Sequence, residues 1–280
     1  LITRMERLMS APDNILKQHE DLLHGVCRLA LTYLESLNIH NLNTSVPSHL
    51  YAVVLCCRLV ELAHTAEVLF QKGALAGIPI ILRSMWEADI DMSNVINDPD
   101  YFKQMYLGFL IEKVRFLKAA KTASTQSAFF NPIVEICSID QELKAVEGEI
   151  SSLKANGIAI LNIRDRAQKA NRTDEYSCVY TNLCLASHNN IVELERSHII
   201  SSNSNHLRVA IFSQKREEYL SHINAVIGIV LKKIEELSTL FGDPPIKDNK
   251  HMLDFIRLQD TIKSEAKRAL SEMASESPTQ

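Results

Sequence analysis

An arginine and two carboxylates occur at helical spacing around residue 87. Arg83, Glu87 and Asp91 follow one another at intervals of four residues in Arg83-Ser-Met-Trp-Glu-Ala-Asp-Ile-Asp. On a helix the three side chains share one face, where Arg83 attracts Glu87. Glu87 and Asp91 repel each other there unless a cation or a partner lies between them. The flanking residues are largely apolar. The three side chains therefore form either a solvated polar stripe on an otherwise apolar helix, or an internal polar or cation-binding site at the centre of a helical bundle.

A second pattern ends in a histidine. In Tyr180-Thr-Asn-Leu-Cys-Leu-Ala-Ser187-His188, a helix places Ser187 almost directly over Tyr180 and His188 about 80° further round. His188 either caps the C-terminus of its own helix or, with Tyr180 and Ser187 nearby, transfers a proton or binds a ligand. The two patterns together provide six candidate binding residues: Arg83, Glu87, Asp91, Tyr180, Ser187 and His188.

Both patterns resemble the signatures of one protein family. Gly73-Ala-Leu-Ala-Gly-Ile-Pro followed by Leu82-Arg83-Ser-Met-Trp-Glu87 is similar to the small-residue turn and L-R-S-x-x-E block of a family of all-helical bacterial proteins of unknown function. Tyr180-x-x-Leu183-x-x-x-Ser187-His188 is similar to its second block, although Cys184 stands where serine is common. The resemblance spans roughly Leu50 to Val192. It implies an α-helical fold with a polar cluster of Arg83, Glu87, Tyr180 and His188, and it implies no reaction.

Arg58 and His64 show a more distant similarity to the HEPN superfamily of helical ribonucleases and toxin-like proteins, often found in phage defence. Those enzymes place an arginine and a histidine a short way apart on a helix and cleave RNA without a metal. Arg58-Leu-Val-Glu-Leu-Ala-His64 lacks the polar residue that usually follows the arginine. The resemblance implies catalysis by Arg58 and His64, or by His188 with an unassigned arginine. The structural alternative is a surface arginine and an ordinary helix histidine.

Two further patterns concern partners and metals. The stretch Lys154–Arg172 contains five Lys or Arg residues and one Asp, so it is a candidate RNA contact, although no aromatic residue is present to stack on bases. Two Glu-x-x-His motifs, Glu61–His64 and Glu195–His198, permit a di-metal carboxylate bundle with Glu35 and Glu87 as further ligands. Such short motifs arise readily by chance, so we assign no metal ligand and expect no cofactor.

The composition disfavours several classes of protein. The chain of 280 residues has 30 Lys and Arg against 34 Asp and Glu, so no overall field attracts nucleic acid or anionic lipid. The six cysteines form no Cys-x-x-Cys pair, and we interpret them as reduced core thiols. No nucleotide loop, Gly-x-Ser-x-Gly or His-Glu-x-x-His is present, and no apolar run reaches the roughly 18 residues of a membrane span. We therefore expect a cytoplasmic protein with no membrane or nucleotide partner.

Helices must position these residues. Eight glycines and eight prolines are too few for the turns of a strand-rich fold. Ser48 and Asp98-Pro99 are typical start signals of helices. Together with the other breaking and capping residues they predict helices over about 12–37, 48–73, 77–96, 98–123, 138–157, 173–188, 215–242 and 248–274, and a short helix after Asn131. Around residues 207–211 an extended segment and a helix are equally compatible with the sequence. Apolar residues spaced 3-4-3-4 form a heptad seam of Leu220, Ile223, Ile227, Val230, Ile234, Leu237 and Phe241.

We therefore predict an all-α bundle of about seven to nine helices, one of them long, C-terminal and coiled-coil-like. Residues 1–242 would form the bundle domain, and residues 243–280 a C-terminal helix and a frayed tail. The seam is either internal core or the interface of a homodimer through residues 215–241. The leading hypothesis for function is an intracellular bacterial binding or regulatory protein. The alternatives are a metal-independent ribonuclease of toxin or defence type and a di-metal bundle.

Overall fold

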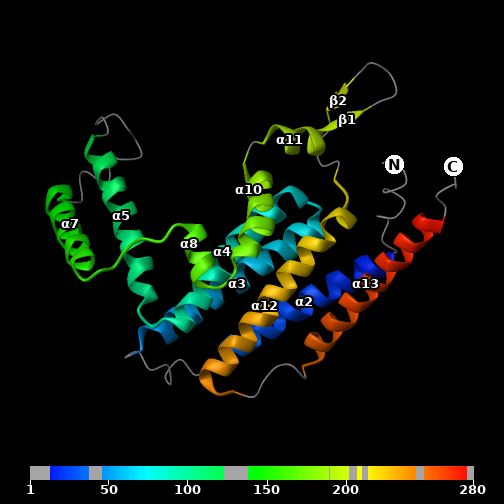
Figure 1. Cartoon of the computed structure of the whole chain (residues 1–280), viewed down its shortest axis with the longest axis horizontal. Helices are drawn as coiled ribbons and strands as arrows, with labels where there is room; N and C mark the ends of the chain where they lie inside the picture. Colours follow the sequence, from blue (N-terminus) through cyan, green and yellow to red (C-terminus); the bar gives the residue numbers. More distant parts are fainter. Residues whose placement is uncertain are drawn as a thin grey trace.

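The computed structural model describes residues 13–37, 46–122, 138–188, 190–201, 207–209, 214–243 and 249–275, which form an all-α multi-helix bundle (Figure 1). No helix within these ranges is long and apolar enough to cross a membrane. The α-helices are α2 (Asp13–Ser36), α3 (Pro47–Lys72), α4 (Ile78–Asn97), α5 (Tyr101–Thr122), α7 (Ile139–Ala155), α8 (Ile163–Lys169), α9 (Thr173–Glu175), α10 (Thr181–Ser187), α11 (Ile191–His198), α12 (Leu220–Phe241) and α13 (Lys250–Ser275). Shorter elements are η2 (Leu75–Gly77), the π-helical η3 (Tyr176–Tyr180), η4 (Arg216–Tyr219), and the antiparallel strands β1 (Ile199–Ser201) and β2 (Leu207–Val209).

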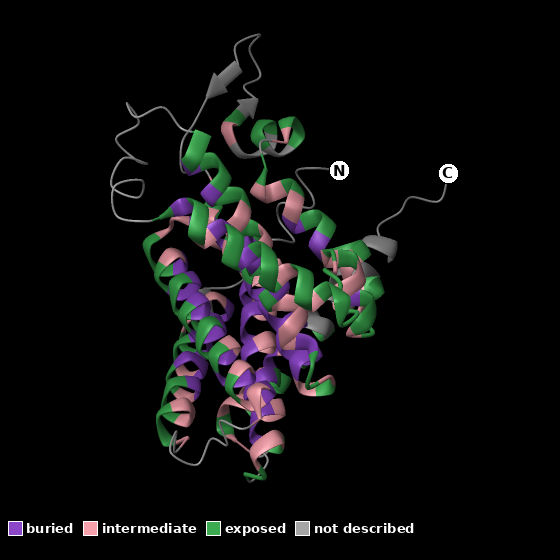
Figure 2. Ribbon diagram, turned by 90° about the vertical axis from the view of Figure 1, so that its left-hand side faces the viewer, coloured by how far each residue is buried: buried purple, intermediate pink, exposed green. Residues whose placement is uncertain are grey.

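The main core lies between α2, α3, α4 and α12. Gly73 ends α3 with a φ of 70°, a left-handed conformation that glycine adopts without strain. The chain then turns through η2, so that α4 packs back along α3. Figure 2 shows the buried residues gathered on the inner faces of the packed helices. The core side chains are mostly aliphatic, together with Phe70, Met85 and Tyr101.

The heptad seam of α12 forms part of this internal core. Its five central residues are buried against α2, α3 and α4, and they are Ile223, Ile227, Val230, Ile234 and Leu237. Leu220 and Phe241 pack at the edges of the same core. Because the seam is covered within one chain, a homodimer through residues 215–241 would have to use other side chains of this helix. That interface stays a prediction.

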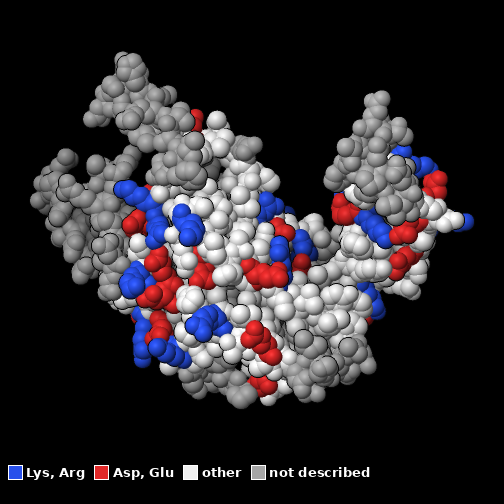
Figure 3. Space-filling model, turned by 180° about the vertical axis from the view of Figure 1, so that it is seen from behind, with Lys and Arg blue, Asp and Glu red and all other residues white. Residues whose placement is uncertain are grey.

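Helices α5 and α7 form an arm beside the bundle (Figure 1). Their contact buries a small separate core of Leu117, Ala120, Ile139 and Leu143. Ion pairs such as Lys118–Glu147 (2.8 Å) and Lys121–Asp140 (2.5 Å) join the two helices outside this core. Seen from behind, the surface is hollowed between this arm and the rest of the molecule (Figure 3).

Several predicted helix ends differ in detail. Ser48 is not the N-cap of α3, because Pro47 already stands in the first turn and Val46 is the N-cap. Helix α5 begins at Tyr101 rather than at Pro99, since the Asp98 carboxylate accepts the Asp100 backbone N–H and forms a turn first. The segment 207–209 is extended and pairs with β1. The predicted short helix after Asn131 and the tail 276–280 lie outside the described residues.

The cysteine prediction is correct only in part. Cys27 and Cys56 are buried free thiols, whereas Cys57 and Cys178 are free but exposed. Burial is the main cause that raises the pKa of Cys27 and of Cys56 to about 12. A thiol that stays protonated at neutral pH is a poor nucleophile, so these two residues are structural.

Helix α13 packs on the bundle where glycines allow a close approach. A Cβ atom built on Gly25 of α2 would lie 2.4 Å from the His251 ring of α13. At Gly228 of α12 a Cβ would lie 3.4 Å from the Phe255 ring. The C-terminal helix therefore contacts the bundle directly, and the domain boundary at residue 242 stays a prediction.

The close approach of α13 to Gly25 predicts that leucine lowers stability at this glycine but not at a helical glycine with open space around it. Gly25→Leu should lower the free energy of unfolding by about 1–3 kcal/mol, because the His251 ring must move. Gly148→Leu is the matched control in α7, where a Cβ meets nothing within 4 Å. It should be neutral or slightly stabilising, by up to about 1 kcal/mol. Urea unfolding of both variants tests this, and equal stabilities would contradict the packing of α13 on α2.

Candidate functional site

Four of the predicted site residues meet on one side of α4. Arg83 donates from Nε to Glu87 Oε1 at 3.3 Å, from Nη2 to the Tyr180 hydroxyl at 3.1 Å and from Nη1 to His188 Nε2 at 3.1 Å. The Tyr180 hydroxyl donates in turn to Glu87 Oε1 at 2.9 Å. We call Arg83, Glu87, Tyr180 and His188 the Arg83 cluster. It joins segments about a hundred residues apart in the chain.

A π-helical turn and stacked aromatic rings position Tyr180. The segment Thr173–Ser187 is continuous helix except at η3, where the Thr181 N–H bonds to the Tyr176 carbonyl five residues back. The Tyr180 ring lies 5.0 Å from Trp86 and 5.5 Å from Tyr176, measured between centroids. Burial and the hydrogen bond to Glu87 raise the pKa of Tyr180 to about 12, so its hydroxyl stays protonated and can donate.

Asp91 extends the network one turn further along α4. Its carboxylate accepts from Arg166 Nη1 at 2.8 Å and from the Tyr101 hydroxyl at 2.6 Å. Arg166 Nη2 also lies 3.9 Å from Glu87 Oε2, so one arginine bridges the two carboxylates. Burial raises the pKa of Asp91, while Arg166 opposes that shift. The predicted repulsion between Glu87 and Asp91 is thus relieved by a basic residue of α8.

The Arg83 cluster is accessible to solvent at one end. The side chains of Arg83 and Glu87 are 25% and 32% exposed, and His188 is exposed. Tyr180 is buried at the other end. The remaining predicted binding residue, Ser187, does not join the cluster, because its hydroxyl donates to the Leu183 carbonyl of its own helix at 2.7 Å.

A groove of about 390 Å³ lies beside the Asp91 end of the network. Helix α5 and the segment before α8 form its walls, and its lining includes Tyr101, Phe109, Ile160 and Arg166. Phe109 is 58% exposed and Ile160 is 46% exposed, so the walls present apolar surface to solvent. The groove therefore has a mixed lining of apolar side chains and charged groups, among them the ion pair of Asp91 and Arg166.

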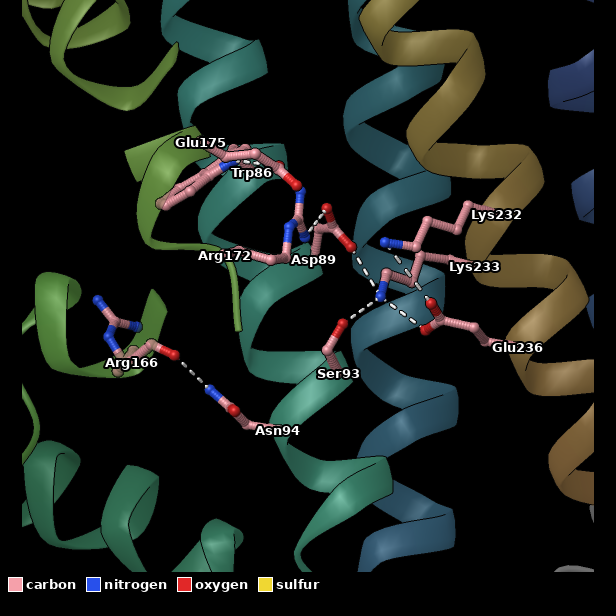
Figure 4. Close-up of polar contacts among 10 residues, drawn as sticks. All are labelled: Trp86, Asp89, Ser93, Asn94, Arg166, Arg172, Glu175, Lys232, Lys233 and Glu236. Atoms are coloured by element: carbon pink, nitrogen blue, oxygen red, sulfur yellow. Dashed lines mark hydrogen bonds and ion pairs between the residues drawn. The ribbon is translucent and has the colours of Figure 1, made fainter. Parts of the chain in front are cut away.

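A second polar cluster lies deep in the bundle and was missed by the sequence reasoning (Figure 4). Lys233 Nζ of α12 lies 2.7 Å from Asp89 Oδ1, and Arg172 bonds the other oxygen of the same carboxylate. Arg172 also bonds Glu175, which accepts the Trp86 indole N–H at 3.3 Å. We call Asp89, Arg172, Glu175 and Lys233 the Asp89 cluster.

The Asp89 cluster is closed to solvent at its centre. The side chains of Lys233 and Asp89 are 0% and 1% exposed, and that of Arg172 is 10% exposed. Lys233 Nζ also bonds Ser93 at 2.5 Å and Glu236 at 2.6 Å. Lys233 therefore has two hydrogen bonds and one ion pair, and a buried ammonium group requires such partners. This cluster has the character of a structural ion-pair network.

The predicted catalytic pair does not form a common site. Arg58 pairs with Glu61 at 3.6 Å on the exposed side of α3. His64 instead contacts Glu67 at 3.1 Å, and the same buried carboxylate contacts His24 of α2 at 2.7 Å. Arg58 and His64 thus interact with different carboxylates. His188 is the candidate histidine that contacts an arginine, and that arginine is Arg83.

The structure bears on the possible di-metal site and on the basic stretch. Over the ranges that the structure describes, no group of three or more His, Cys, Asp or Glu residues could hold a metal ion, so Glu61–His64 and Glu195–His198 do not converge with Glu35 and Glu87. In the basic stretch 154–172, three of the five basic residues form ion pairs within the protein, namely Arg166 with Asp91, Lys169 with Asp98 and Arg172 with Asp89. An RNA contact at this stretch stays a prediction.

Comparison with protein-family models gives one match. Residues 49–206 match a model described as a family of unknown function (DUF5677). The chain belongs to the DUF5677 family. No curated protein and no solved structure matches the chain. The DUF5677 segment includes the elements from α3 to β1 and contains the whole Arg83 cluster. Lys233 lies outside it, so the Asp89 cluster fastens the DUF5677 segment to α12.

The predicted uncharacterised helical family is thereby confirmed in its general form. The two sequence blocks as family signatures, the bacterial source and the HEPN similarity stay predictions. Because DUF5677 is itself a family of unknown function, the match adds no reaction, and the function must be argued from the site.

The Asp89 cluster predicts a large loss of stability when its acid is neutralised. Asp89→Asn should lower the free energy of unfolding by about 3 kcal/mol or more, because Lys233 and Arg172 would remain buried without a shared counter-ion. Asp100→Asn is the matched control, since the Asp100 side chain is 68% exposed and pairs with Lys103 on the surface. It should change stability by less than about 1 kcal/mol.

A double variant shows whether the loss comes from uncompensated charge. Asp89→Asn with Lys233→Met removes one buried charge of each sign and should recover part of the lost stability in urea unfolding. A double variant as unstable as the sum of its single variants would contradict the direct pairing of Asp89 with Lys233.

Proposed function

We propose that this DUF5677 protein is an intracellular binding or regulatory module of bacteria and that the Arg83 cluster is its ligand site. One observation carries the proposal. Three side chains from two distant segments hold the Arg83 guanidinium, yet the Arg83 side chain is 25% exposed and contacts an exposed histidine. An ordered cationic donor held at the surface is prepared to bind an anionic group.

The Asp89 cluster on the same helix provides an internal comparison. There, Asp89 and Lys233 are almost wholly excluded from water, and each charge has its partners inside the protein. The Arg83 cluster has a similar number of ordered polar groups, but its outer members face solvent. Because exposed ion pairs contribute little to stability, a stabilising role explains the Arg83 cluster less well than it explains the Asp89 cluster.

The contact between Arg83 and His188 is the one that a ligand can replace. Glu87 and Tyr180 are held by each other as well as by Arg83. His188 is exposed and lies at the end of α10, so it can move away from Arg83 without breaking the rest of the cluster. A ligand oxygen that entered between the two side chains would accept a charge-assisted hydrogen bond from Arg83 Nη1.

This proposal predicts that oxyanions perturb the Arg83 cluster. Titration with dimethyl phosphate or acetate should shift the NMR signals of the Arg83 side chain and the His188 ring. Arg83→Gln should abolish the perturbation, while Ser187→Ala should leave it unchanged because that hydroxyl bonds its own helix. Unperturbed signals at high concentrations of both anions would contradict the proposal.

A second function has a specific observation in its favour. Arg83 Nη1 lies 3.1 Å from His188 Nε2, and this contact supports Arg83 as the unassigned arginine of the ribonuclease hypothesis. An arginine that binds a phosphate beside a histidine that moves a proton can cleave RNA without a metal. We therefore keep metal-independent RNA cleavage, of toxin or defence type, as the alternative.

The ribonuclease alternative predicts cleavage that depends on Arg83 and His188. Purified protein incubated with total RNA in a chelating buffer should give fragments, and His188→Ala should reduce the rate by about a hundredfold or more. Arg58→Ala is the control, since Arg58 is exposed and pairs with Glu61. Equal fragment patterns from the wild type and His188→Ala would reject this alternative.

A further inference from the structure

We infer that His188 takes up a proton when the Arg83 cluster binds its ligand, and that the ligand is a singly charged oxyanion. The inference rests on the proposed function and adds two properties to it. These are the charge of the ligand and the control of its binding by pH.

The observed contact identifies the protonation state of His188. An arginine guanidinium has five N–H donors and no acceptor, so Arg83 Nη1 must donate in the 3.1 Å contact with His188 Nε2. His188 Nε2 therefore carries a lone pair, and the imidazole is neutral with its hydrogen on Nδ1. Arg83 therefore donates to a neutral His188 in this contact.

Protonation of His188 changes this contact from attraction to repulsion. A protonated imidazole is a donor at both nitrogens, so Nε2 could no longer accept from Arg83. Two cationic donors would then face each other at a separation where like charges repel strongly. An oxyanion between them removes the repulsion, because its oxygens accept from Arg83 Nη1 and from His188 Nε2 together.

The groups around this pair do not supply that anion themselves. Glu87 Oε1 already accepts from Arg83 Nε and from the Tyr180 hydroxyl, and Arg166 lies 3.9 Å from its other oxygen. Tyr180 stays protonated and neutral because burial and Glu87 raise its pKa to about 12. Cys184 of α10 is the other titratable group that interacts electrostatically with Arg83. The hydrogen bonds that Glu87 accepts thus come from Arg83 and Tyr180, and His188 contacts Arg83 instead.

The charges of the side chains in the network indicate the charge of the ligand. Arg83 and Arg166 carry two positive charges, and Glu87 and Asp91 carry two negative charges, so the network is neutral while His188 is neutral. Protonation of His188 leaves one positive charge without compensation. A singly charged oxyanion neutralises it, whereas a doubly charged one would leave a negative charge beside Glu87. A phosphodiester and a carboxylate both have this single charge.

The test is the titration of the His188 ring by NMR with and without an oxyanion. Dimethyl phosphate is the phosphodiester probe and acetate the carboxylate probe, with potassium chloride at equal ionic strength as reference. Dimethyl phosphate keeps its single charge while imidazoles titrate, between about pH 5 and 8. The titration midpoint of His188 should rise by about one unit if the protonated form binds tenfold more tightly, and the affinity should fall as pH rises. The probe with the larger rise identifies the ligand type.

Matched variants and a doubly charged probe complete the design. Arg83→Gln should abolish the rise, Ser187→Ala should preserve it, and the ring of His64, which contacts Glu67 on α3, should titrate identically in every buffer. A His188 midpoint that does not move while Arg83 signals respond to the anion would overturn the inference and leave the proposed function standing. No response at any residue of the cluster would overturn both. Tighter binding of sulfate than of dimethyl phosphate would overturn the single charge.

Discussion

The acidic residues of α4 must be neutralised where they lie, and much of the arrangement follows from this requirement. Asp89 and Asp91 are buried, and a buried carboxylate without a partner is strongly unfavourable. Lys233 comes from α12 to one of them, while Arg166 and Arg172 come from the α8–α9 region. These ion pairs hold remote segments against α4. Since α10 continues directly from α9 and η3, they also bring Tyr180 and His188 to Arg83.

Local signals made most of the fold predictable. Three of the predicted helix ranges finish at glycines, Gly73, Gly157 and Gly242, and all three have positive φ angles, a conformation that favours glycine. The α12 seam was visible as a heptad pattern and is buried as core. The wrong start residues show the limit of such signals. At the start of α3, Pro47 and Ser48 both suited the first turn, and at α5 the Asp98 carboxylate forms a turn before the helix begins at Tyr101.

Only part of the candidate site was predictable from the sequence, namely the part indicated by residue spacing and by the family resemblance. The turn-by-turn spacing placed Arg83, Glu87 and Asp91 on one face, and the resemblance joined Tyr180 and His188 to them. The role of Arg166 was not predicted, although its signal was present. Residues 84–101 contain acids and no Lys or Arg, and residues 154–172 contain five Lys or Arg and one Asp, so the two stretches have opposite charge. Which acid meets which base depends on tertiary packing, and neither periodicity nor propensity contains that information.

The two clusters lie on opposite sides of α4 and have different roles. The Asp89 cluster holds the helix in place, and the Arg83 cluster has exposed members that can move. The closed Asp89 cluster fixes the position of α4 against α12 and the α8–α9 region, so the backbone under Arg83 is held rigidly. A rigid base allows the outer members of the Arg83 cluster to stay exposed and still keep their geometry. The π-helical turn before Tyr180 fits this division. Such turns insert an extra residue into a helix and occur frequently at functional sites. Here the turn sets Tyr180 toward α4, while His188 remains at the helix end, where its contact with Arg83 can open without disturbing the core.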